Sequence, residues 1–129
     1  MPEEIIEEKP EEVVEESSTP RISIDEFAKI KVQVGTVLSA ALVPETEKLL
    51  RLSVDFGEPK GPRQIVSGIR AYVEEPEDLV GRQLAFVTNL APRKIKGFES
   101  DGMLFAVGEA DAFAFLTPDR PIPPGTSAH

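Results

Sequence analysis

The chain has 129 residues, a length that fits one domain, and a formal net charge of −9. It has no cysteine, which excludes disulfides and thiolate zinc sites. Its single histidine is the last residue, His129, which excludes the positioned imidazole of a catalytic triad. No apolar run approaches the ~20 residues that span a membrane, and the acidic N-terminus is unlike a secretory signal. We therefore expect a cytoplasmic protein with no membrane partner.

The negative charge is concentrated at the N-terminus. Residues 1–20 hold eight Glu and one Lys, whereas residues 21–129 hold 15 acidic and 13 basic residues. Pro10 interrupts any helix in the first segment, and its apolar pairs are too sparse to bury. We expect residues 1–20 to be an acidic disordered tail or linker and residues 21–129 to be the domain. The tail is interpreted as solvating; an acidic docking segment or a competitor of an anionic ligand are the alternatives.

The domain begins with a helix signal. Ser23 and Glu26 match a capping box, and Ile24, Phe27 and Ile30 recur on one helical face. These residues predict a short helix of about two turns that packs over an apolar surface.

After Ile30 the hydrophobic period changes from 3.6 to 2, which is typical of half-buried strands. Gly35 within the first alternating run predicts a bulge or a bend. Pro76 can start one helical turn. The predicted strands lie near residues 31–43, 49–57, 63–69, 82–90 and 101–108, with a short edge near 113–118 and an extended end over 118–129.

Five short strands with turn signals and little helix predict an all-β domain closed into a small barrel. The OB-fold, a five-stranded Greek-key barrel, has this pattern and binds oligonucleotides through one face and its loops. An SH3-like barrel or a β-sandwich would show the same periodicity, so the pattern alone leaves these three open.

Catalytic motifs are missing from the sequence. The glycines form neither a Walker loop nor a dinucleotide-binding motif. The acidic residues between Glu74 and Asp78 have the composition of a solvated loop. We therefore expect a binding module that is not an enzyme and needs no cofactor or metal.

Three cations stand out in this acidic chain. Arg93, Lys94 and Lys96 lie between Pro92 and Gly97, in a predicted turn that joins two strands. Exposed bases on a barrel rim attract phosphate and release counterions, although they can equally be ordinary solubilising charges. Further bases that one barrel face could gather are Lys48, Arg51, Arg63 and Arg70.

Several stretches resemble one family. They are "IDEFAKIKVQVGTVLSA" with "VPETEKLLRLSVDFG", then "RQIVSGI", "NLAPRKIKGFESDGMLFA" and "LTPDRPIPPGT". In order, they resemble the tRNA-binding domain found at the C-terminus of many methionyl-tRNA synthetases and in free-standing tRNA-binding proteins. The resemblance covers residues 22 to about 127. It implies an OB barrel with a C-terminal extension, often a homodimer, that grips the tRNA body by shape. A smaller chaperone branch is similar, but "RQIVSGI" looks closer to the synthetase type.

The resemblance implies binding residues position by position. It places Ser100 and Met103 near RNA, where the hydroxyl can bond phosphate or a 2′-OH and the thioether can contact a base. Met103 equally fits a core position in phase with Phe105. Gln33 stands where the family usually has Arg. The matching residues are Lys48, Arg63, Ser67, Asn89, Lys94, Ser100 and Met103.

The predicted function is a non-catalytic tRNA-binding module, a homodimer that aids a methionyl-tRNA synthetase in cis or in trans. The alternative is a secretion-type chaperone-like homodimer that binds unfolded polypeptide. The expected dimer contact is the Pro-rich end, through Leu116, Ile122 and Pro123.

Overall fold

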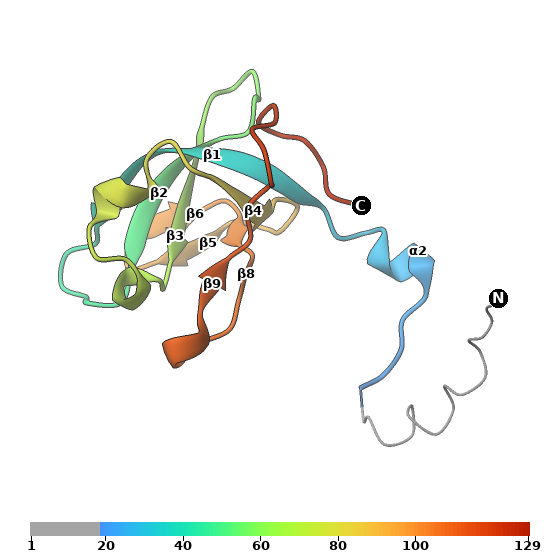
Figure 1. Cartoon of the computed structure of the whole chain (residues 1–129), viewed down its shortest axis with the longest axis horizontal. Helices are drawn as coiled ribbons and strands as arrows, with labels where there is room; N and C mark the ends of the chain where they lie inside the picture. The colour runs from blue at the N-terminus through green and yellow to red at the C-terminus, as the bar shows by residue number, and fades with distance from the viewer. Residues whose placement is uncertain (1–18) are drawn as a thin grey trace.

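The structure is a computed structural model that describes residues 19–129 (Figure 1). The acidic segment predicted over residues 1–20 lies almost wholly outside the described residues. The described chain is mostly strand and turn, with a single short α-helix. Its elements are α2 (Ile24–Phe27), β1 (Val32–Leu42), β2 (Leu50–Asp55), β3 (Arg63–Ser67), η2 (Arg70–Tyr72), η3 (Pro76–Leu79), β4 (Gln83–Val87), β5 (Arg93–Ile95), β6 (Phe98–Ser100), β7 (Met103–Leu104), β8 (Ala106–Val107), η4 (Ala110–Ala112) and β9 (Ala114–Phe115).

Five antiparallel strands form the barrel wall in the order β3-β2-β1-β4-β7. Strand β3 lies against β7, so the sheet nearly closes on itself. The long β1 makes this possible because its second half pairs with β2 and its first half pairs with β4. The predicted all-β, OB-like five-stranded barrel is confirmed.

The inward faces of the strands supply the core, as period-2 alternation requires. Along β2 the residues alternate between buried and half-buried positions, with Leu50, Leu52 and Val54 inside. Phe56 follows them and meets Phe86 of β4 edge to face, with ring centroids 5.4 Å apart. Burial of these side chains is the main favourable contribution to folding.

The bulge in β1 is not at the residue that the sequence predicts. The register shifts between Val37 and Ser39, so the bulge is at Leu38 and not at Gly35. Gly35 instead allows two layers to approach, because a Cβ there would lie 2.5 Å from Val54 Cγ1 and 2.6 Å from Phe56 Cε1. A bulge at Gly35 was a wrong prediction, because close packing explains the glycine, and the alternative of a bend at Gly35 stays a prediction.

The C-terminal extension belongs to the barrel. Beyond the end of β2, the free edge of β1 is taken by the last residues: Gly125 N–H donates to the Val34 carbonyl at 2.7 Å, and Val34 N–H donates to the Thr126 carbonyl at 2.9 Å. The Gln83 side chain also bonds both backbone groups of Ile122. The extension therefore satisfies backbone groups that an open sheet edge would leave unpaired.

Helix α2 has the predicted cap but not the predicted packing. The Ser23 hydroxyl accepts from Glu26 N–H and the Glu26 carboxylate accepts from Ser23 N–H, both at 3.1 Å. The helix has four residues, none of them buried, and it projects from the barrel (Figure 1). The expectation of two turns packed on an apolar surface was wrong.

The predicted fifth strand divides in two. Only Met103–Leu104 joins the barrel, as β7, while Ala106–Val107 forms a separate hairpin with β9. Tyr72 holds this hairpin, because its ring stacks on Phe113 with centroids 4.0 Å apart and its hydroxyl accepts from Ala110 N–H. Among residues 19–129 no helix is long and apolar enough to cross a membrane.

Candidate nucleic-acid interface

The three cations singled out in the sequence lie on a hairpin of their own. Strands β5 and β6 pair with Ile95 opposite Phe98, so only Lys96 and Gly97 form the turn. Both have positive φ, 52° and 83°, as the two central residues of a type I′ hairpin turn require. The prediction that all three cations lie in a turn was therefore wrong, because Arg93 and Lys94 lie on strand β5 and only Lys96 lies in the turn.

The cations do not all point the same way. In the strand register Lys94 lies opposite Glu99, with both side chains on one face of the hairpin, whereas Arg93 lies opposite Ser100 on the other face. Lys96 sits at the turn. All three side chains are exposed, and none makes an ion pair with another residue between 19 and 129. They present unpaired positive charge in more than one direction.

The inner face of the hairpin covers the barrel wall. Val66 on the outside of β3 is only 4% exposed, and its N–H donates to the Ser100 hydroxyl at 3.0 Å. Arg51 on the outside of β2 lies beneath the hairpin, with its guanidinium carbon 4.9 Å from the Phe98 ring centroid. Phe98 was not predicted from the sequence, although an apolar residue directly after a Lys-Gly turn indicates an inward-facing hairpin position.

Arg63 occupies a different environment. Its guanidinium donates two parallel hydrogen bonds to the Glu58 carboxylate, at 2.9 and 2.7 Å, and one to the Thr88 carbonyl at 2.8 Å. It also pairs with Asp101 at 3.7 Å, and its side chain is 13% exposed. These partners join three loops at one end of the barrel.

This pairing shifts both ionisation equilibria. The hydrogen bond from Arg63, aided by its charge, holds the pKa of the Glu58 carboxyl below its ordinary value despite partial burial. The same hydrogen bond raises the pKa of Arg63. Glu58 was not singled out from the sequence, because a Glu in a Pro- and Gly-rich turn resembles any solvated acid.

Ser100 is buried, with an exposed fraction of 1%. Its hydroxyl accepts from Val66 N–H and donates to the Gly102 carbonyl at 3.1 Å, so both capacities are used inside the protein. Met103, in contrast, is 39% exposed on β7, and the core interpretation of Met103 is wrong. The contact with RNA predicted for these two residues stays a prediction, and the geometry favours it only for Met103.

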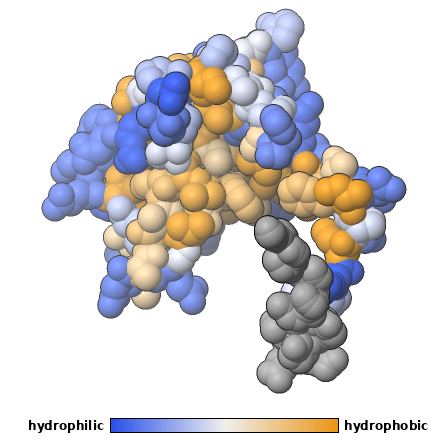
Figure 2. All heavy atoms as spheres, turned by 45° about the vertical axis from the view of Figure 1, so that its right-hand side comes forward, coloured by the Kyte–Doolittle hydropathy of each residue, from blue (hydrophilic) through white to orange (hydrophobic). Residues whose placement is uncertain are grey.

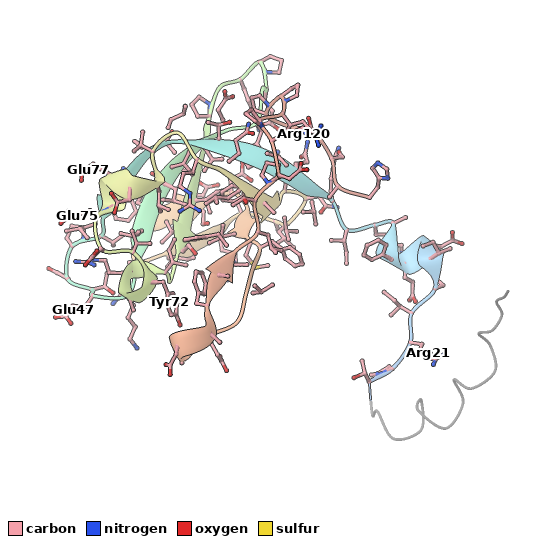
Figure 3. The ribbon with its side chains drawn as sticks, viewed as in Figure 1. Arg21, Glu47, Tyr72, Glu75, Glu77 and Arg120 are labelled. Atoms are coloured by element: carbon pink, nitrogen blue, oxygen red, sulfur yellow. The ribbon has the colours of Figure 1, made fainter. Side chains whose placement is uncertain are left out.

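The other binding residues that the family resemblance implies lie on different parts of the barrel. The Asn89 amide ties the segment after α2 to the barrel, through Lys31 N–H and the Lys29 carbonyl. Ser67 is half-buried at the end of β3. Lys48 is exposed on the β1–β2 loop beside Glu47, whose side chain points outward on the same side of the barrel as Glu75 and Glu77 (Figure 3). Lys48 lines one surface hollow together with Glu45 and Glu47, whose negative charges weaken its attraction for an anion.

Gln33, which stands where the family usually has Arg, has a structural role. Its amide donates to the Gly125 carbonyl at 2.8 Å and accepts from the Thr88 hydroxyl. Of the residues expected at a dimer contact, Leu116 and Ile122 are half-buried within the chain and Pro123 is exposed.

Exposed apolar side chains gather elsewhere. Ile24, Phe27 and Ile30 at α2 are 76%, 51% and 49% exposed. Figure 2 shows apolar residues on the helix continuing onto the adjoining part of the barrel. We call Ile24, Phe27 and Ile30 the helix face.

The barrel and its cationic hairpin define a small β-barrel binding domain, and comparison with known proteins agrees. The family described as "Putative tRNA binding domain" matches residues 32–127. The methionine–tRNA ligase of Methanoregula boonei is 50% identical over 108 residues, which is 84% of this chain and 16% of that protein. This chain thus spans about a sixth of that curated relative.

Two solved structures are similar over nearly the whole barrel. A MetRS-related protein from Pyrococcus horikoshii is 36% identical with a TM-score of 0.78, covering 86% of this chain and all of that one. The chaperone CsaA from Bacillus anthracis is 31% identical with a TM-score of 0.73, covering 85% of this chain and all of that one.

The chain belongs to the tRNA-binding domain family, which confirms the resemblance drawn from its motifs. Domains of this family are non-catalytic, so the expectation that this domain is not itself an enzyme is confirmed by membership.

Proposed function

We propose that this domain binds tRNA by shape and charge, without recognising an anticodon, and thereby aids a methionyl-tRNA synthetase in cis or in trans. The observation that supports this proposal most strongly is the β5–β6 hairpin. It carries three exposed cations without ion-pair partners among residues 19–129, Arg93, Lys94 and Lys96, in a member of the tRNA-binding domain family. The described residues are nearly neutral overall, so the hairpin acts as a local phosphate grip. The cytoplasmic location predicted from the sequence is part of this proposal.

The test is binding of bulk tRNA by fluorescence anisotropy across a salt series. The double variant Lys94→Ala/Lys96→Ala should bind more weakly, with a salt slope smaller by roughly two contacts. The matched control Lys29→Ala/Lys60→Ala removes the same charge from other loops and should change affinity less. Absence of binding at low salt, both in the full chain and after deletion of residues 1–18, would contradict the proposal.

We also propose that the domain is a homodimer. The helix face is apolar, exposed and carried by a capped helix that contacts no core, which is the pattern of a surface buried by another copy. The predicted contact through Leu116, Ile122 and Pro123 stays part of the proposal, with Pro123 the most accessible of the three. Light scattering should give a dimer mass for the wild type and a monomer mass for Phe27→Asp, which is expected to keep its barrel.

A second candidate function is that of a chaperone-like homodimer, in which Leu116, Ile122 and Pro123 form the dimer contact and the helix face stays open and binds unfolded polypeptide. It is favoured by that exposed apolar surface and by the likeness to CsaA chaperones. A fluorescently labelled, reduced and unfolded polypeptide is the probe. Salt-insensitive binding that Phe27→Asp abolishes, together with absent tRNA binding, would favour this candidate over the first.

A further inference from the structure

A cleft of about 260 Å³ lies on the outer face of strands β1, β2 and β3, beside the cationic hairpin. Strand register explains the hollow. Ser39 lies opposite Ser53, Ala41 lies opposite Arg51, and Ser53 lies opposite Gln64. Three neighbouring positions thus carry small side chains, while the long side chains of Arg51 and Gln64 form walls.

Arg51 is the unusual member of this cleft. Its Nε is shielded from solvent and has no hydrogen-bond partner, and no ion pair joins its guanidinium to any residue in the described part of the chain. Phe98 supports the guanidinium from the hairpin side at 4.9 Å. A buried donor without a partner destabilises the folded state, and such exceptions in native proteins call for an explanation.

Arg63, the second arginine of the cleft, differs from Arg51 because its hydrogen-bond donors have partners. Arg63 lines the same hollow, but Glu58, Thr88 and Asp101 occupy its donors. The hydroxyls of Ser39 and Ser53 bond to none of the residues between 19 and 129. The cleft therefore combines one free guanidinium with two free hydroxyls.

This donor set fits a phosphate group. The two Nη groups of an arginine form a planar fork that matches two oxygens of a phosphate, while the shielded Nε of Arg51 lies behind them, and hydroxyls can donate to the remaining oxygens. The volume is below the roughly 300 Å³ at which small-molecule pockets begin, which suits one backbone unit and not a whole free ligand. The Gln64 amide gives its Nε2–H to the Glu99 carbonyl, leaving its Oε1 as an acceptor for a 2′-OH.

We propose that this cleft is a subsite for one phosphate and ribose of an RNA backbone, held by Arg51, Ser39 and Ser53. The inference rests on the proposed function and extends it from the hairpin to the barrel wall. RNA is favoured over a peptide carboxylate because Phe98, which supports Arg51, belongs to the hairpin that carries Lys94 and Lys96. A polyanion can reach both sites at once, whereas an isolated carboxylate gains nothing from the second.

The first test uses Arg51→Met in the full chain, because Met keeps an unbranched apolar stem and removes the fork. The expected result is tRNA binding weaker by about 10- to 100-fold and a salt slope smaller by about one contact, with an unfolding temperature that is not lowered. Arg51→Lys should recover only part of the affinity, since it restores charge without the fork. The control is Arg82→Met, whose guanidinium also rests on a ring, Phe115 at 5.1 Å, away from the cleft.

The outcomes separate the two proposals. If the wild type binds tRNA and Arg51→Met binds equally tightly with the same salt slope, the subsite is overturned and the proposed function stands. If Arg51→Met loses affinity and unfolding temperature together, Arg51 supports the hairpin and the subsite is again overturned.

If the wild type fails to bind tRNA, the proposed function is contradicted. A direct titration then tests whether the cleft binds an RNA backbone unit. The probe is the diribonucleotide ApA, followed through the Nε–H resonance of Arg51 by ¹⁵N NMR. A saturable shift that is larger with ApA than with its deoxy analogue supports the subsite. No shift, or an equal shift with a poly-glutamate peptide, overturns it.

Discussion

Replacing Arg63 by Met should destabilise the barrel without weakening tRNA binding by the folded protein. The guanidinium makes three short hydrogen bonds and one longer ion pair across loops that meet at the barrel end, and its side chain is 13% exposed. Breaking a fully buried pair costs about 3–5 kcal/mol and a surface pair about 0–1 kcal/mol. For this partly buried group we expect about 2–3 kcal/mol, which corresponds to a fall of about 10–20 °C in Tm.

The assay for Arg63 is thermal unfolding followed by circular dichroism, with Glu58→Gln and the double variant completing a cycle. We expect a coupling energy of about 1–3 kcal/mol, because the two side chains share parallel charge-assisted hydrogen bonds. Arg82→Met serves as the matched control, since it removes an exposed arginine held by a ring contact alone. The opposite result, a Tm within a few degrees of the wild type together with weaker tRNA binding, would refute the reasoning and make Arg63 an RNA contact.

Three further predictions concern stability. Because the hydrogen bond and charge of Arg63 lower the pKa of the Glu58 carboxyl, the stabilising contribution of this pair is present above the unfolded-state pKa and is lost as pH falls through the lowered folded-state pKa. Urea titrations of wild type and Glu58→Gln should therefore converge in acid, below that folded-state pKa, and differ near neutrality; parallel curves would contradict this. Ser100→Ala leaves the buried Val66 N–H without its acceptor and should lower the unfolding free energy by about 1–3 kcal/mol in urea, whereas Ser67→Ala, whose hydroxyl bonds to no residue between 19 and 129, should not. Gly35→Ala forces a Cβ against Val54 and should cost about 1–3 kcal/mol, measured as a lower Tm; an unchanged Tm would show that the layers can separate freely.

The local features of the fold were predictable because they depend on near neighbours. The reciprocal bonds of Ser23 and Glu26 need only three residues of separation, and they are present. The alternation of Leu50, Leu52 and Val54 identified the inner face of β2 because side chains on a strand alternate strictly. The single helical turn after Pro76 also formed, as the 3₁₀ helix η3.

The candidate site was predictable only as a set of residue types. Arg51 and Arg63 are indistinguishable in the sequence as bases on predicted strands. Only the barrel shows that Arg63 is opposite Val54 and turns to Glu58 at the barrel end, while Arg51 is opposite Val66 and faces the outer cleft. Likewise the motif that contains Ser100 and Met103 points to one loop, yet one side chain is buried and the other exposed.

By itself, the sequence determined the alternating pattern of the first four barrel strands, the helix cap, the cationic segment and the family to which the chain belongs. Those properties reside in spacing and residue type along a continuous stretch. The tertiary structure decided which cations have partners, where the bulge in β1 lies and which apolar face remains uncovered. The physical reason is that each of these depends on a group brought close by strand pairing, as Asn89 is to Lys31 across 58 positions of chain.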